Sequence, residues 1–210
     1  MIGGVGRAVD PTANQDVGVT TESSESKPGL AIDVLLPLDK TNTLADAPRR
    51  ARETAATGVD GLFTFEGQHD VFFPLVAAAS SGPLDVDLMT NVAIAFPRSP
   101  MHLAYSAYDL QALSGGRFRL GLGSQIKPAI QRRYGSTWVK PVAQMRETVL
   151  ATKAILNHWE GLGPLDFRGE YTTHTLMTPN FNPGPNPFGL PKVLVGALGP
   201  KMTEMTAEVA

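Results

Sequence analysis

The sequence predicts an α/β fold with a parallel sheet, and three observations support this prediction. Short apolar runs rich in Val, Ile and Leu recur along the chain. Each of the first three runs is followed by a segment in which small and apolar residues recur at helical spacing. Gly, Ser and Pro separate the segments. Because a parallel connection must cross over through a helix, this alternation is typical of βαβ units.

Residues 1–29, at the start of the chain, lack this alternation. They mix Gly, Ser, Thr, Asp and Pro with few large apolar residues and show no sustained period. Such a segment cannot repay the entropy cost of ordering its backbone. We therefore expect a disordered tail over residues 1–29 and a single folded domain over residues 30–210.

Five segments are expected to form strands. The first is an apolar run that suits a strand buried on both faces, and it ends at Asp39. The third is the run VDLMTNVAIAF, which has the polar residue Asn91 near its middle. The five strands are expected over residues 31–39, 61–66, 86–96, 117–123 and 192–198.

Five helices are expected between and after these strands. Thr43 can cap the first helix, which Gly58 ends, and Pro74 occupies the permitted first turn of the second. Two more are expected over residues 100–113 and 141–159, and a last one begins within residues 201–210. Residues 124–191 otherwise break the rhythm and become dense in Asn, Pro and Gly, which indicates an insertion or a functional loop.

The number of strands leaves two architectures open. A (β/α)8 barrel has eight strands and typically ~250 residues. With five strands visible, the chain would hold about the first five βα units of an incomplete barrel. A five-stranded doubly wound sheet accounts for the same alternation.

The composition excludes several classes of site and partner. The net charge is -2 and the pI is about 6.1, so no broad positive field favours nucleic acid or an anionic membrane. The chain has no cysteine, which excludes disulfides, thiolate metal sites and cysteine nucleophiles. Its histidines share no metal-ligand spacing. We expect no bound metal and a cytoplasmic protein without a membrane-spanning segment.

Three blocks of sequence carry a resemblance to a known family. They are LFTFEGQHDVFFPLVAAAS over residues 62–80, TNVAIAFPRSPMHLAYSAYDLQALSGGRFRLGLGSQ over residues 90–125, and PKVLVGALGPKMTEMTAEVA over residues 191–210. Together, and in this order, they resemble the luciferase-like monooxygenase family, most closely its branch that uses coenzyme F420. The similarity covers most of residues 30–210, and its middle block is the most specific part.

The resemblance implies a TIM barrel with its active site at the carboxyl ends of the strands. It implies an oxidoreductase that transfers a hydride between coenzyme F420 and a small organic substrate. A monooxygenase that uses FMN and dioxygen is the alternative enzyme, and an inactive fragment or binding module is an alternative of another class. The full-length form is expected to be a homo-oligomer.

The resemblance also implies a histidine beside the reactive ring, and His69 occupies this position. A hydride carrier leaves proton transfer to the protein, so His69 is the expected general acid or base. Glu66 is the second expected catalytic residue, because it flanks His69, together with Asp70, at the end of the second strand.

Cofactor contacts are expected from the ends of four of the five strands, because the second supplies the catalytic candidates. Asn91 and Val92 lie where the F420 branch carries a bulge with a non-proline cis peptide. The missing side chain of Gly123 would let a ring or a phosphate approach the backbone. The segment Asn180 to Gly189 is either a lid over the substrate or a plain loop. The expected cofactor-binding residues are Asp39, Asn91, Val92, Gly123, Ser124, Gln125, Gly196, Ala197 and Gly199.

Overall fold

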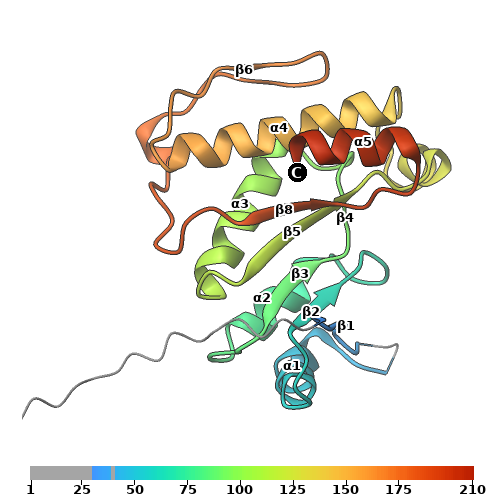
Figure 1. Ribbon diagram of the computed structural model, residues 1–210, viewed down its shortest axis with the longest axis vertical. Coiled ribbons are helices and arrows are strands. Elements are labelled where there is room, and N and C mark those ends of the chain that lie inside the picture. The colour runs from blue at the N-terminus through green and yellow to red at the C-terminus, as the bar shows by residue number, and fades with distance from the viewer. Residues whose placement is uncertain (1–29, 39–40) are drawn as a thin grey trace, which may run out of the picture. The chain divides into compact units, whose positions relative to one another are not determined.

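The structure, a computed structural model, describes residues 30–38 and 41–210 (Figure 1). The tail expected over residues 1–29 and the candidate cofactor contact Asp39 lie outside the described residues. The helices and strands all belong to the compact unit Ala31–Ala210. In the part that is described, no helix is both long enough and apolar enough to cross a membrane.

Six strands form a parallel sheet (Figure 1). The strand order begins β1-β2-β3-β5, and both β4 and β8 also pair with β5. Every pairing in this sheet is parallel, which confirms the predicted α/β class. The strands are β1 Asp33–Leu35, β2 Gly61–Thr64, β3 Asp87–Thr90, β4 Ala93–Ile94, β5 Phe118–Gly123 and β8 Lys192–Val195.

Five α-helices follow the strands, and the sequence predicted all five. The longest has the predicted bounds, since it begins at Pro141 and ends at Trp159. A short 3-10 turn, Leu44–Asp46, precedes the first. Thr43 is its N-cap, and Asp46 Oδ2 accepts the Thr43 backbone N–H at 2.9 Å in a capping box. The helices are α1 Ala47–Ala55, α2 Phe73–Ala79, α3 Pro100–Leu113, α4 Pro141–Trp159 and α5 Pro200–Val209.

The hydrophobic core lies between one face of the sheet and the helices. Leu62 pairs with Leu88 across β2 and β3, and Leu120 pairs with Val193 across β5 and β8. These four side chains are buried in one cluster with residues from all five helices. The helix residues in that cluster include Ala51, Leu75, Leu103, Met145 and Met205. Burial against helices explains why the strands are apolar runs in the sequence.

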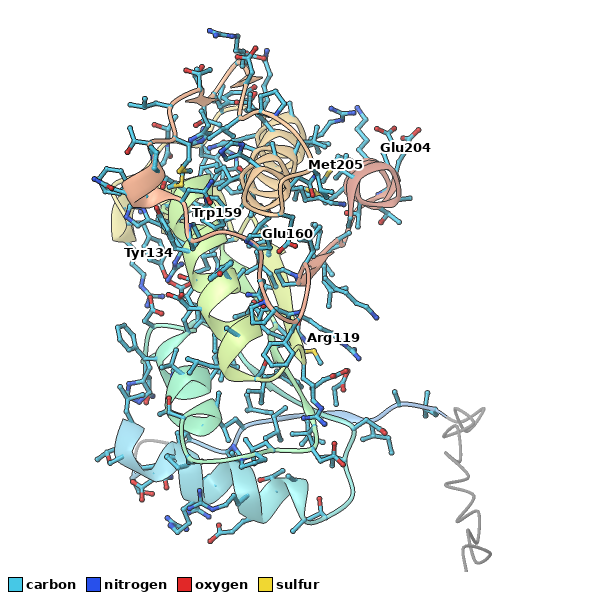
Figure 2. All side chains as sticks on the ribbon, turned by 90° about the vertical axis from the view of Figure 1, so that its left-hand side faces the viewer. Arg119, Tyr134, Trp159, Glu160, Glu204 and Met205 are labelled. Atoms are coloured by element: carbon cyan, nitrogen blue, oxygen red, sulfur yellow. The ribbon has the colours of Figure 1, made fainter. Side chains whose placement is uncertain are left out.

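The opposite face of the sheet is only partly covered. Leu35, Phe63, Met89 and Arg119 form one row across four strands, and Arg119, labelled in Figure 2, forms an ion pair with Asp87 of β3. Leu35 at one edge is 41% exposed. Within the described residues β1 pairs only with β2, and β8 only with β5. The sheet therefore does not close into a barrel, which agrees with the incomplete barrel that was predicted.

A bulge divides the third predicted strand into β3 and β4. The residue number rises by four from Met89 to Ala93, whereas it rises by three between their partners on β5, Arg119 and Leu122, so one extra residue lies in the bulge. The Thr90 hydroxyl replaces the lost ladder contacts by donating to Gly121 O at 2.7 Å and accepting from Gly121 N at 2.9 Å. The peptide bond Asn91–Val92 is cis, as the resemblance implies.

The insertion between β5 and β8 contains structure that the sequence did not predict. Residues Ala129–Arg133 form a π-helical turn, and β6 Phe167–Arg168 pairs with β7 Thr173–His174 in an antiparallel hairpin outside the main sheet. Glu147 of α4 holds this hairpin by accepting backbone N–H groups from residues 170, 171 and 172 at 2.6 to 2.7 Å. Strands of two residues produce no readable period, and this long-range contact has no sequence signal.

The loop that was considered as a lid lies at the wrong edge of the sheet. Asn186 Nδ2 donates to Tyr108 O at 2.9 Å, and Gln111 Nε2 donates to Phe188 O at 3.3 Å. Gln111 also accepts the N–H of Phe118, the first residue of β5, so this part of the loop lies at the amino ends of the strands. The lid interpretation is therefore wrong, and the loop packs on α3.

The side chain of Trp159 on α4 packs against α3. Its ring, labelled in Figure 2, lies 4.8 Å from the ring of Tyr105 and 5.7 Å from that of Tyr108, both on α3. The side chain is 1% exposed and belongs to a second apolar cluster that also contains Ile155 and Leu165. This aromatic contact fixes the helices that follow the bulge and β5.

Candidate active site

The carboxyl ends of the parallel strands place several predicted site residues at one edge of the sheet. Ile94 of β4 pairs with Gly123 of β5, and the Gly196 N–H donates to Leu122 O at 2.8 Å. A Cβ on Gly196 would lie 3.4 Å from Val92 Cγ1. Val92, Gly123 and Gly196 are thus neighbours, whereas Ser124, Gln125, Ala197 and Gly199 lie on the loops that follow β5 and β8.

The structure explains why glycine occupies positions 121 and 123 at the end of β5, which the sequence did not reveal. A Cβ on Gly121 would overlap the Thr90 carbonyl oxygen, and a Cβ on Gly123 would overlap the Val92 side chain. The space beside Gly123 was expected to admit a ring or a phosphate, but Val92 fills it. These two glycines make room for the bulge of β3 and β4, so a contact between the cofactor and Gly123 remains a prediction.

A cavity of about 280 Å³ lies at the ends of β1 and β2. His69 and Gln68 supply polar groups to its wall, and most other lining side chains are apolar. None of the hydrogen bonds among the described residues involves the His69 ring, which leaves both ring nitrogens available. The lining residues are Leu35, Leu36, Leu38, Thr64, Phe65, Gly67, Gln68, His69 and Pro74.

Glu66, the other expected catalytic residue, has both carboxylate oxygens occupied. Its Oε2 accepts the Ile94 N–H at 2.9 Å and Arg98 Nη1 at 2.6 Å, and its Oε1 accepts the Tyr134 hydroxyl at 3.1 Å. The Glu66 side chain is 7% exposed. These three donors hold the carboxylate in one orientation. The geometry therefore favours a role for Glu66 in holding Ile94, Arg98 and Tyr134 together, and its catalytic role stays a prediction.

Arg98 is the centre of this polar network. Besides Glu66, it contacts Asp70 Oδ2 through Nη2 at 2.7 Å and donates to Ile94 O at 2.9 Å. Burial acts to lower the pKa of Arg98, but the two carboxylates outweigh it and hold the pKa above its usual value. The guanidinium is therefore a permanent charge that joins both ends of the segment from Glu66 to Asp70.

Tyr134 and Arg133 attach the π-helical turn to the same segment. Tyr134 follows that turn, and Arg133 Nη2 donates to Gly67 O at 2.9 Å. Burial, and then the charge of Glu66, raise the pKa of Tyr134, so its hydroxyl stays protonated as a donor. Sequence reasoning assigned no role to Arg98 or Tyr134. Their partner Glu66 lies 32 and 68 residues away in the chain, a separation that leaves no pattern to read.

Gln125 has an unusual backbone at the end of β5. Its φ of 61° lies in the left-handed region, which residues other than glycine rarely adopt. Its Oε1 accepts the N–H of Ile126 at 3.1 Å, which stabilises the sharp turn. Non-glycine residues in this conformation cluster at functional sites, and a contact between Gln125 and the cofactor stays a prediction.

The remaining histidines do not join the site. His102 bonds Ser99 Oγ, His158 bonds Gly163 O and His174 bonds Thr172 Oγ1, each within five residues along the chain. Across residues 30–38 and 41–210, no three His, Asp or Glu side chains are grouped in a way that could hold a metal ion. Of the four histidines, His69 is the one that lines the cavity at the strand ends.

Comparison with known proteins identifies relatives. The family model described as luciferase-like monooxygenase matches residues 15–210. An uncharacterized protein of Mycobacterium tuberculosis is 45% identical over 169 residues, which cover 80% of this chain and 49% of the relative. A putative coenzyme F420-dependent oxidoreductase of the same organism is 30% identical over 178 residues, covering 79% of this chain and 50% of the relative. The chain thus spans about half the length of these relatives.

Solved structures share the fold at low sequence identity. EDTA monooxygenase from a Chelativorans species superposes with a TM-score of 0.68 at 16% identity, over 86% of this chain and 52% of that one. An F420-dependent secondary alcohol dehydrogenase superposes with a TM-score of 0.66 at 19% identity, over 86% and 56%. The fold is that of luciferase-like TIM-barrel enzymes, as the resemblance implied, with part of the barrel present.

Proposed function

The chain belongs to the luciferase-like monooxygenase family, and from this premise we propose that it is part of an oxidoreductase that transfers a hydride between coenzyme F420 and a small organic substrate. The relatives include a putative F420-dependent oxidoreductase, and the solved structures with this fold include both F420 and FMN enzymes. The proposal is the F420 reaction, and the FMN monooxygenase reaction is its rival.

The observation that carries the proposal is the availability of His69. On the segment from Glu66 to Asp70, both carboxylates are bound to Arg98, whereas the imidazole lines an apolar cavity and has no hydrogen-bond partner among the described residues. His69 is therefore the group on this segment that can accept or donate a proton. Glu66, first expected beside it as a catalytic residue, acts in this proposal as a positioning anion.

The cofactor would be held by the loops after the strands. No atom lies within 4 Å of the position that a Cβ on Gly199 would take, and α5 begins at the next residue, Pro200. Open space and a helix amino terminus therefore meet there. Asn91 and Gln125 are exposed at the same edge. Together with Val92, Ser124, Gly196 and Ala197, these residues would hold the ring and its polar tail. A bound deazaflavin supplies a two-electron hydride carrier at this place.

In this proposal the protein moves the proton of the substrate's oxygen group. A bound deazaflavin would supply the hydride acceptor. In the oxidation of an alcohol to a ketone, a ring nitrogen of His69 would take the O–H proton as the C–H bond breaks and the C=O bond forms. The reverse reaction returns the proton from His69 to the oxygen. The apolar walls of the cavity suit a substrate with an apolar body and one oxygen group, and they limit the access of water to the reacting atoms.

Cofactor titration tests this proposal. The full-length protein should bind F420 with saturable quenching of the deazaflavin fluorescence, and FMN much more weakly. His69→Ala should keep F420 binding, because the ring contacts come from other strands. Tight FMN binding with no F420 binding would overturn the proposed cofactor in favour of the monooxygenase. The titration run on an analytical centrifuge also tests our further proposal that the full-length form is a homo-oligomer.

A further inference from the structure

We propose that Arg98 is a positioning residue that fixes the His69 loop, defined as residues 66–70, relative to β4. This inference rests on the proposed role of His69 in proton transfer. Arg98 lies far from the loop in the chain and touches it at both ends, through Glu66 and through Asp70. The side chain thereby sets where the imidazole stands at the mouth of the cavity.

The first argument is the geometry of the contacts. Nη1 of Arg98 lies 2.6 Å from Glu66 Oε2, and Nη2 lies 2.7 Å from Asp70 Oδ2, so one planar guanidinium spans the loop. Arg133 holds the middle of the loop at Gly67 O. At the base, Thr64 Oγ1 donates to Val71 O at 2.7 Å in a buried bond. The loop is therefore held at its ends, middle and base, while His69 itself carries no bond.

The second argument is that Arg98 is itself fixed. Its side chain is 16% exposed, and it donates to the carbonyl oxygen of Ile94, the last residue of β4. Its Cζ lies 5.6 Å from the centre of the Phe72 ring, over its face. Glu66 accepts the N–H of the same Ile94. Arg98 and Glu66 are thus both hydrogen-bonded to the backbone of Ile94. The loop is therefore held at a fixed position relative to β4.

The third argument is the choice of arginine. A lysine ammonium has no fork with which to reach two carboxylates at fixed separation, and its stem is more flexible. The two carboxylates alone, without a cation, would repel each other across the loop. A side chain that served stability alone would not need to bridge both ends of the one segment that carries the available histidine.

The test compares four variants of the full chain. Arg98→Met removes the bridge, and Arg98→Lys keeps the charge without the fork. Asp70→Asn releases one end of the loop while Glu66 keeps its cation. This variant should stay folded, so it tests the loop even if Arg98→Met unfolds. Arg49→Met is the matched control, because Arg49 also bridges two carboxylates, Asp46 and Glu53, but on the surface of α1.

The first readout needs no cofactor. Amide hydrogen exchange of the peptide that covers residues 66–70 should become faster by on the order of tenfold in Asp70→Asn and more in Arg98→Met, with the core strands unchanged. Arg49→Met should leave that peptide as in the wild type. Unchanged exchange in both Asp70→Asn and Arg98→Met would overturn the proposal, because the loop would then be held without the arginine.

The second readout separates positioning from binding. With F420 and 2-propanol as the probe alcohol, a displaced histidine should lower kcat by ~100-fold in Arg98→Met while KM and the F420 Kd change by less than about twofold. Arg98→Lys should restore only part of kcat. If kcat stays unchanged while exchange rises, Arg98 is a structural residue only and the inference is wrong. If the wild type binds no F420 but shows the exchange pattern, the proposed function fails and the role of Arg98 in holding the loop stands.

Discussion

Two arginines of this chain each bridge two carboxylates, but in different surroundings. Arg49, on α1, reaches Asp46 at 3.1 Å and Glu53 at 3.0 Å, and its side chain is 50% exposed. Arg98 reaches Glu66 and Asp70 with the same two nitrogens, but its side chain is 16% exposed. The Arg49 partners are three and four residues away, and the Arg98 partners are 32 and 28 residues away.

The difference teaches what such a bridge can do. An ion pair along one exposed helix is screened by water, and it joins only residues that are already close in the chain. A buried bridge between a strand end and a distant loop fixes tertiary structure, and its charges cannot be left unpaired at low cost. The number of ion pairs around an arginine is therefore a poor guide to its importance, whereas the burial and the chain separation of its partners are informative.

The largest effect on stability is expected from Arg98→Met. It leaves Glu66 buried with a backbone N–H and a hydroxyl but no cation, which should lower the free energy of unfolding by about 3 kcal/mol or more. Urea denaturation measures it, with Arg49→Met as the reference that should show no detectable shift of the midpoint. Equal midpoints for the two variants would remove the distinction between the sites.

A smaller effect is expected from Glu66→Gln. The amide keeps the shape but presents N–H groups where Ile94, Arg98 and Tyr134 all donate, so at least one of these donors loses its acceptor. The expected loss is about 1–3 kcal/mol. Thermal and urea unfolding should agree on the ranking below Arg98→Met, and a gain in stability would contradict the buried anion at Glu66.

Tyr134→Phe should cost about 1 kcal/mol, the typical net value of one hydrogen bond. The bond should matter only while Glu66 is a carboxylate. In a double-mutant cycle, Tyr134→Phe should therefore have less effect in the Glu66→Gln background than in the wild type. Strict additivity of the two substitutions would show that the hydroxyl does not act through Glu66.

The smallest effect concerns acid stability at His174, far from this network in the β6–β7 hairpin. Burial lowers the pKa of His174, so the folded state binds fewer protons than the unfolded state. The contribution of neutral His174 to the free energy of unfolding should therefore be fully present above its unfolded pKa of 6.5, and it should be lost as the pH falls below that value. His174→Asn should reduce this slope slightly in the pH dependence of the unfolding midpoint. An unchanged slope would assign the acid sensitivity to other groups.

The fold could be predicted from the sequence because its signals are local. Pro100 and Ser99 mark the start of α3, and Ser99 Oγ accepts the His102 N–H as a capping residue should. The third strand was predicted as one run, but it is two, because an apolar run does not show that one residue bulges out. The resemblance implied the bulge at Asn91 and Val92, whereas the structure adds that Gly121 and Gly123 make room for it.

The candidate site could be predicted only where it follows strand ends. His69 was expected from the resemblance, and the rule that parallel strands bring their carboxyl ends to one edge named Glu66 and the loops after β5 and β8 as further candidates. Arg98, Tyr134 and the π-helical turn were missed, since they look in sequence like a turn before a helix and a polar insertion. What distinguishes them is contact with Glu66 across many residues, and no single-sequence pattern encodes such contacts.

The most direct test of the account is the rate of F420 reduction by an alcohol in the wild type and in His69→Ala, measured from the loss of deazaflavin absorbance under anaerobic conditions. The proposal predicts that His69→Ala binds F420 as the wild type does and reduces it about 10² to 10⁴ times more slowly, the usual contribution of a general acid or base. A His69→Ala variant that reduces F420 at the wild-type rate would contradict it.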